Sequence, residues 1–228
     1  ITAAEGIRQA APAGVEVEYF DSGRSAKKVD PAAIEEAAVR AATADVVVLV
    51  VGDNDLRYDE ADKTGGENID RSDIELPGNQ LDLVKAVVAT GKPVVVVFVS
   101  GRPIGSEFSV AQSKAALAAF QPGAKGGQAL GEIRFGTVTP SGRLPIPMPR
   151  NAGQIQVYYN HLPSQYFHRY VMTSSDPLYW FGHGLSYTAY RYSDLRVPAT
   201  VRPGEPVEVS VDVTNAGPRD GEEVVLLY

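Results

Sequence analysis

The chain has 228 residues, a length that fits one α/β domain with a sizeable core and part of a second domain. Its formal net charge is −7, which argues against a nucleic-acid or anionic-membrane partner because neutralising phosphates requires clustered Lys and Arg. Cysteine is absent, so disulfides, a thiolate nucleophile and Cys-ligated zinc are excluded. No apolar run in the sequence has the length of a membrane span.

The first part of the chain alternates strand and helix patterns. Residues 14–19 alternate Val and Glu, which predicts a half-buried or edge strand. Asp30 is a typical N-cap and Pro31 suits the first position of a helix, so a helix should begin there. The nearly pure Val and Leu run at residues 45–52 is typical of a strand that is covered on both faces.

The alternation continues beyond a long polar segment. The sequence predicts a helix over residues 80–90, a second buried strand over 94–99, a shorter strand over 115–120 and a helix over 126–135. This order indicates a mostly parallel sheet with helices on both faces. We therefore expect an α/β sandwich domain over residues 1–150.

The pattern changes after about residue 140. Alternating prolines and frequent Tyr and Phe predict an extended strap and linker over residues 151–189. Residues 190–228 are expected to be the start of an incomplete β-sandwich of the fibronectin type III sort. The reason is a set of strand patterns separated by Pro-Gly and Asn-Ala-Gly-Pro turns, at 191–197, 207–213 and 224–228. Both ends of the chain look like cuts in a longer protein.

The polar segment over residues 53–76 is the most informative part of the sequence. It leaves the carboxyl end of the first buried strand, where ligands of open α/β sheets bind, and loops of this length are often functional. An EF-hand calcium loop is excluded, since counting from Asp53 puts Arg57 at a ligand position and Tyr58 where Gly is needed. The many carboxylates leave two interpretations: a solvated acidic loop, or a general acid/base whose pKa is raised by like charges and partial burial.

An ordered set of motifs resembles the second domain of family-3 glycoside hydrolases. The motifs cover nearly the whole chain, at residues 51–54, 70–80, 91–97, 100–103, 121–127, 135–145, 153–160 and 177–187. The resemblance implies a six-stranded α/β sandwich followed by a fibronectin-like domain. It also implies a retaining β-glycosidase whose nucleophilic Asp lies on an N-terminal barrel domain of the same protein, outside this chain.

The resemblance further implies that a Glu of the 53–76 segment is the general acid/base. Glu60 has the spacing from the preceding strand that many relatives show and is the preferred candidate, with Glu67, just before an Asp-Arg pair, as the alternative. Tyr58 and Arg71 are the candidate substrate-binding residues. Tyr58 would form a stacking wall for a sugar ring, and Arg71 would mainly organise the loop through its planar guanidinium.

The implied activity is exo-acting hydrolysis of terminal β-D-glucosyl residues, so the substrate would be a β-linked oligosaccharide or glycoside. A β-xylosidase of the same family and a non-catalytic carbohydrate-binding or structural module are the alternatives. We expect no cofactor, and no metal because His161, His168 and His183 lack metal-ligand spacing. What relatives commonly do implies a periplasmic or secreted protein, with the cytoplasm left open.

Overall fold

The computed structural model describes residues 1–55, 61–66, 68–160 and 170–227. Its first part is built on a parallel sheet of three strands, β1 (Val47–Gly52), β2 (Val94–Val99) and β3 (Ala115–Phe120). The strands lie in the order β1-β2-β3, and Val47 pairs with Val94. The parallel sheet that the sequence predicted is confirmed. The described residues contain three of its strands, not the six that the resemblance implied.

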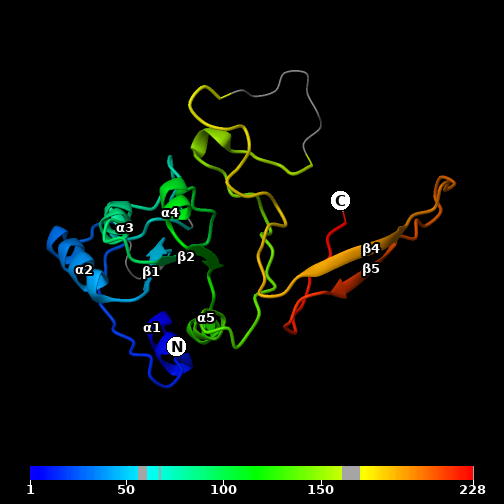
Figure 1. Ribbon diagram of the computed structural model, residues 1–228. Helices are drawn as coiled ribbons and strands as arrows, with labels where there is room; N and C mark the ends of the chain where they lie inside the picture. The colour runs from blue at the N-terminus through cyan, green and yellow to red at the C-terminus, as the bar shows by residue number, and fades with distance from the viewer. Residues whose placement is uncertain (56–60, 67, 161–169, 228) are drawn as a thin grey trace.

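Helices cover both faces of this sheet (Figure 1). On one side lie α2 (Pro31–Thr43), α3 (Gln80–Val88) and α4 (Glu107–Gln112). On the other side lie α1 (Ala3–Ala10) and α5 (Gly126–Arg134), which pack against each other. The layered α/β arrangement is therefore confirmed.

The helix ends follow from local sequence. Asp30 caps α2 by accepting a hydrogen bond from the backbone amide of Ala32, and Pro31 occupies the first helical position. In α1, Thr2 and Glu5 form a reciprocal capping box. The close packing of α1 against α5 depends on Gly6, because a Cβ there would lie 1.7 Å from a backbone oxygen of α5.

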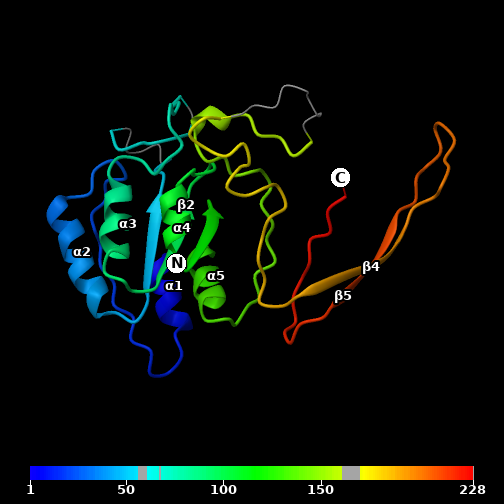
Figure 2. The ribbon, with the colours of Figure 1, turned by 45° about the horizontal axis from the view of Figure 1, so that its top comes forward.

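The hydrophobic core lies between the sheet and the α2–α3 side. Alternate residues of β2 point into it, and Val94 and Val96 are almost completely buried. They pack against apolar side chains of α3, of which Val84 and Val87 are also buried. Because β1 and β2 pair in parallel, their carboxyl ends meet at one edge of the sheet (Figure 2).

The strand expected over residues 14–19 is absent from the structure. Val15 and Tyr19 are 46% and 57% exposed, and the backbone amide of Val15 donates to Pro12 in a turn. Alternation produces a strand only where a neighbouring strand supplies ladder hydrogen bonds. None of the three described strands of this sheet pairs with this segment, so its backbone stays outside the ladder.

The later part of the chain doubles back along the α/β layers (Figure 2). Met148 pairs with Tyr179, and Leu144 exchanges two backbone hydrogen bonds with residues 182 and 183. A short 3-10 helix, η1 (Ala152–Gln154), follows Met148 in the chain. No helix in the described ranges is long and apolar enough to cross a membrane.

The chain then forms an antiparallel pair, β4 (Tyr190–Arg196) and β5 (Ser210–Asn215), in which Tyr190 pairs with Asn215. Two of the three late strands are therefore found, with β5 shifted toward the C-terminus. The third expected strand is wrong for residues 224–227, which form no strand in the structure. A two-stranded ribbon does not by itself establish a sandwich, so the fibronectin-like domain stays a prediction.

Candidate active site

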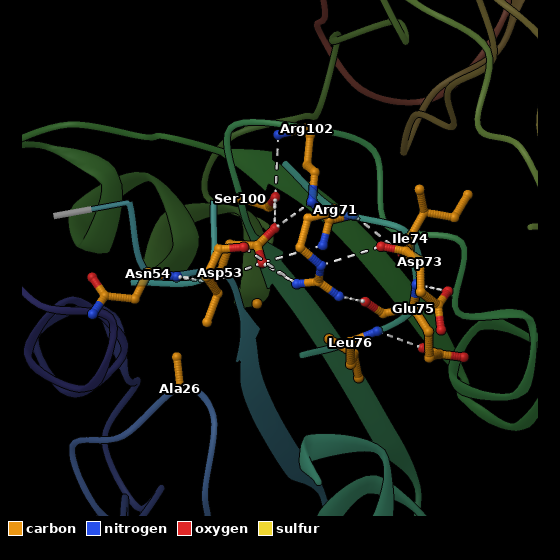
Figure 3. A network of polar contacts seen from close by, with 12 residues as sticks. Ala26, Asp53, Asn54, Arg71, Asp73, Ile74, Glu75, Leu76, Ser100 and Arg102 are labelled. Atoms are coloured by element: carbon orange, nitrogen blue, oxygen red, sulfur yellow. Dashed lines mark hydrogen bonds and ion pairs between the residues drawn. The ribbon is translucent and has the colours of Figure 1, made fainter. Parts of the chain in front are cut away.

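The carboxylate of Asp53, at the end of β1, lies at the centre of a polar network (Figure 3). Its side chain is fully buried. Oδ1 accepts hydrogen bonds from Thr64 Oγ1 at 2.9 Å, Arg71 Nη1 at 3.1 Å and Arg102 Nη2 at 3.2 Å. Oδ2 accepts one from Ser100 Oγ at 2.7 Å, and Arg102 Nε lies 2.9 Å away as an ion-pair contact. Asp53 therefore anchors the structure and is not open to a substrate.

The two guanidinium groups also hold the far end of the polar loop. Arg71 donates from Nε to the carbonyl of Asp73 and from Nη2 to that of Glu75, at 3.2 and 3.1 Å. Arg102 Nη1 donates to the carbonyl of Ile74 at 3.2 Å. Burial lowers the pKa of the Arg102 guanidinium from its ordinary value, and the Asp53 carboxylate opposes that shift.

Two parts of the polar loop are hydrogen-bonded to each other: residues 53–55, here called the first leg, and residues 62–64, the second leg. Thr64 donates its backbone amide to the carbonyl of Asn54, and Asn54 donates its own amide to Thr64 Oγ1, both at 2.8 Å. Asp55 accepts a hydrogen bond from Gln121 Nε2 at 2.7 Å, which links the loop to the end of β3. Residues 53–55 and 62–64 therefore form a fixed base for the segment between them.

A turn over residues 25–27 holds the second leg from the other side. Asp62 accepts hydrogen bonds from the Ser25 hydroxyl and from the amide of Ala26, the latter at 2.8 Å. Asn54 Nδ2 also donates to this carboxylate, at 3.3 Å. The desolvation that Asp62 undergoes acts to raise its pKa, but the donors, with Ser25 first, outweigh it and lower the pKa below its ordinary value.

The last two residues of the Leu-Pro-Gly-Asn-Gln motif, which ends the loop, hydrogen-bond to backbone groups earlier in the chain. Gln80, at the start of α3, exchanges two hydrogen bonds of 2.8 Å with the backbone of Gly52 and donates a third to the carbonyl of Ala26. Asn79 exchanges two hydrogen bonds with the backbone of Val29. These side chains tie the end of β1 and the segment before α2 to the start of α3.

This domain matches the family described as "Glycosyl hydrolase family 3 C-terminal domain" over residues 1–187. The chain belongs to that family. Curated relatives of this family-3 domain include a "Periplasmic beta-glucosidase" of Salmonella typhimurium, 40% identical over 93% of the chain and 29% of the relative. A "Beta-xylosidase" of Formosa agariphila is 38% identical over 85% of the chain and 26% of the relative.

Solved structures give the same result for the family-3 domain. A β-glucosidase from Erythrobacter marinus has a TM-score of 0.83 and 38% identity, covering 97% of this chain and 32% of that one. A β-glucosidase from Listeria innocua in complex with isofagomine has a TM-score of 0.79 and 30% identity, covering 94% and 30%. The chain thus spans less than a third of the length of these relatives.

The residues that the sequence proposed for the site fall in different places. Arg71 lies in the Asp53 network of the family-3 domain. Glu60, its alternative Glu67 and Tyr58 lie outside the described residues. On either side of position 67, the amide of Ile69 donates to the carbonyl of Gly66 at 3.1 Å. Within the described ranges, no cluster of acidic and His side chains could hold a metal ion.

Sequence reasoning missed the central role of Asp53 and the supporting roles of Ser100, Asp62 and Gln80. A signal existed for the first two, because each directly follows a buried strand and carboxyl ends of parallel strands meet at one edge. No signal of that kind marked Asp62, since its donors Ser25, Ala26 and Lys27 lie 35 to 37 residues earlier in the chain and only Asn54 is near it in sequence.

Proposed function

We propose that this chain is the C-terminal part of a retaining, exo-acting β-glycosidase that releases terminal β-D-glucosyl residues. The polar loop supplies the general acid/base Glu, and an N-terminal barrel domain of the same protein supplies the Asp nucleophile. The observation that carries the proposal is the anchored base of the loop. Burying a carboxylate between two arginines costs desolvation free energy. Such an anchor is expected where a loop must hold a reacting group in a fixed position.

The chemistry explains why anchoring matters. In the first step the Glu donates a proton to the glycosidic oxygen while the Asp attacks the anomeric carbon, forming a glycosyl-enzyme. In the second step the same Glu takes a proton from water, which hydrolyses that intermediate. The two carboxyl groups must stand about 5–5.5 Å apart. An error of about 1 Å in such a geometry can reduce the rate about 100-fold.

Two glutamates compete for the acid/base role. The spacing from β1 favours Glu60, which lies between the Asp55 and Asp62 anchors. The described anchors favour Glu67, which lies three residues after Thr64 and four before Arg71, both bonded to Asp53. We keep both as candidates, with Tyr58 as a stacking wall for the sugar and Arg71 as the organiser of the loop.

The sugar and the setting follow from the relatives. The names of the relatives favour a β-glucoside as substrate and keep a β-xyloside as the second candidate. One relative is called periplasmic, which supports a periplasmic or secreted location over the cytoplasm. We also propose the division into an α/β sandwich over 1–150, a strap over 151–189 and the start of a fibronectin-like domain over 190–228.

Hydrolysis by the intact protein that carries this chain tests the proposal. We expect 4-nitrophenyl β-D-glucoside to be cleaved with a higher kcat/KM than the β-D-xyloside. Proton NMR recorded during the first minutes should show the β-anomer of glucose before mutarotation, because two displacements retain configuration. The α-anomer as first product would contradict retention. Sugar binding without hydrolysis would favour a non-catalytic carbohydrate-binding module.

A further inference from the structure

We propose that Asp62 is a positioning residue for the acid/base loop and acts by tying the loop's second leg to the turn at residues 25–27. The inference rests on the proposed function. Among the residues that the structure describes, the hydroxyl of Ser25, the amides of Ala26 and Lys27, and the side-chain amide of Asn54 all donate to this carboxylate. Lys27 Nζ adds a contact of 2.8 Å to the carbonyl of Ala61. The leg is thus held through both its side chain and its backbone.

The turn that holds Asp62 is itself fixed to the core. Gln80 Nε2 donates to the carbonyl of Ala26, and Gln80 is 6% exposed at the start of α3. Gly78 packs directly on the backbone of Lys27, where a Cβ would lie 1.7 Å from the carbonyl oxygen. The Asn79 side chain fixes Val29 just beyond. The turn therefore gives Asp62 a rigid reference point.

Gln80 also links the two legs of the loop. The same side chain that holds Ala26 exchanges two hydrogen bonds with Gly52, the residue before Asp53. The first leg is therefore positioned through Gly52 and Asp53, and the second through Ala26 and Asp62. One buried side-chain amide therefore contacts the anchoring points of both legs.

Accurate positioning of the proton donor affects the rate only for substrates whose leaving group must be protonated as it departs. Phenyl β-D-glucoside has a weakly acidic leaving group that requires acid assistance, whereas 2,4-dinitrophenyl β-D-glucoside leaves without it. In the intact protein, Asp62→Asn should therefore reduce kcat/KM about 10- to 30-fold for the phenyl glucoside and less than about 3-fold for the dinitrophenyl glucoside. Ser25→Ala, which removes one donor, should show the same trend with a smaller size.

Asp21→Asn is the matched control, since Asp21 is exposed and accepts a hydrogen bond from the amide of Gly23 within its own turn. It should leave both substrates unaffected. If kcat/KM fell equally for both glucosides in Asp62→Asn and in the milder Ser25→Ala, the role of Asp62 would be purely structural. That result would overturn the inference and leave the proposed function intact. No hydrolysis by the unchanged protein would overturn both.

Discussion

Gln80 and Gly52 exchange two hydrogen bonds: the amide of Gly52 donates to Oε1 of Gln80, and Nε2 donates back to the carbonyl of Gly52, each at 2.8 Å. A side chain of α3 thus completes the edge of β1 at the residue where the polar loop begins. The geometry of the loop is consequently linked to the buried core of the domain.

Gln80→Leu should lower the free energy of unfolding by about 2–4 kcal/mol. The apolar replacement leaves the amide and carbonyl of Gly52 and the carbonyl of Ala26 without their partner in a part-buried site. Urea denaturation followed by fluorescence measures the change. Gln112→Leu, at an exposed position at the end of α4, should stay within about 0.5 kcal/mol of the unchanged protein. Equal stabilities of the two variants would show that the Gln80 contacts carry little energy.

Asp53→Asn should be destabilising by about 2–4 kcal/mol, because the substitution leaves two arginines beside a neutral buried group. The matched control is Asp212→Asn, in the ion pair with Arg196 whose side chains are 53% and 62% exposed. That variant should lose less than about 0.5 kcal/mol. Denaturant midpoints of both variants, compared at one pH, measure the difference. A loss at Asp53 as small as that at Asp212 would contradict the anchoring role.

Gly52→Ala should lower the free energy of unfolding by about 3 kcal/mol or more. A Cβ at this position would lie 1.9 Å from the carbonyl oxygen of Val99, so β1 and β2 would have to separate. Gly91→Ala provides the comparison, since Gly91 also has a positive φ but has open space around the added carbon. Backbone strain alone predicts a loss of about 1–2 kcal/mol there. Thermal unfolding curves distinguish the two cases, and similar losses would disprove the close approach.

The contribution of Asp62 should depend on pH in a defined direction. Its hydrogen bonds lower the pKa in the folded state, so its stabilising effect is complete well above the unfolded value of about 3.9 and is lost as the pH falls through the lower folded value. The difference in Tm between the unchanged protein and Asp62→Asn should be constant from pH 7 to about pH 5 and should shrink below about pH 4. A difference that grows on acidification would contradict the hydrogen-bond pattern.

Much of the fold followed from local patterns, and the exceptions have physical reasons. Strands β1 and β2 were predictable because uninterrupted runs of Val and Leu are typical of the strands of a parallel sheet, and β3 was inferred as a shorter apolar run of the same kind. The helices α1 and α4 were missed, since α4 has only six residues and α1 has a single buried residue, Gly6. Residues 14–19 show the opposite error, because they alternate like a strand but pair with none of the described strands of the sheet.

The site was predictable only in part. The position of the polar loop and the involvement of Arg71 could be inferred from motifs. The network around Asp53 was missed, because its partners Ser100 and Arg102 come from the end of β2, almost 50 residues away in the sequence, and the one available signal was that Asp53 and Ser100 each follow a buried strand. Only the parallel pairing of β1 with β2 brings these side chains to one point.

The measurement that tests the central claim most directly compares Glu60→Ala with Glu67→Ala in the intact protein, with and without sodium azide. The true acid/base variant should hydrolyse 2,4-dinitrophenyl β-D-glucoside slowly, because the glycosyl-enzyme accumulates without a general base. Azide, which attacks without base assistance, should restore turnover and give β-glucosyl azide, while the other variant should remain active and insensitive to azide. If both variants retain full activity, or neither yields the azide adduct, the loop does not carry the acid/base.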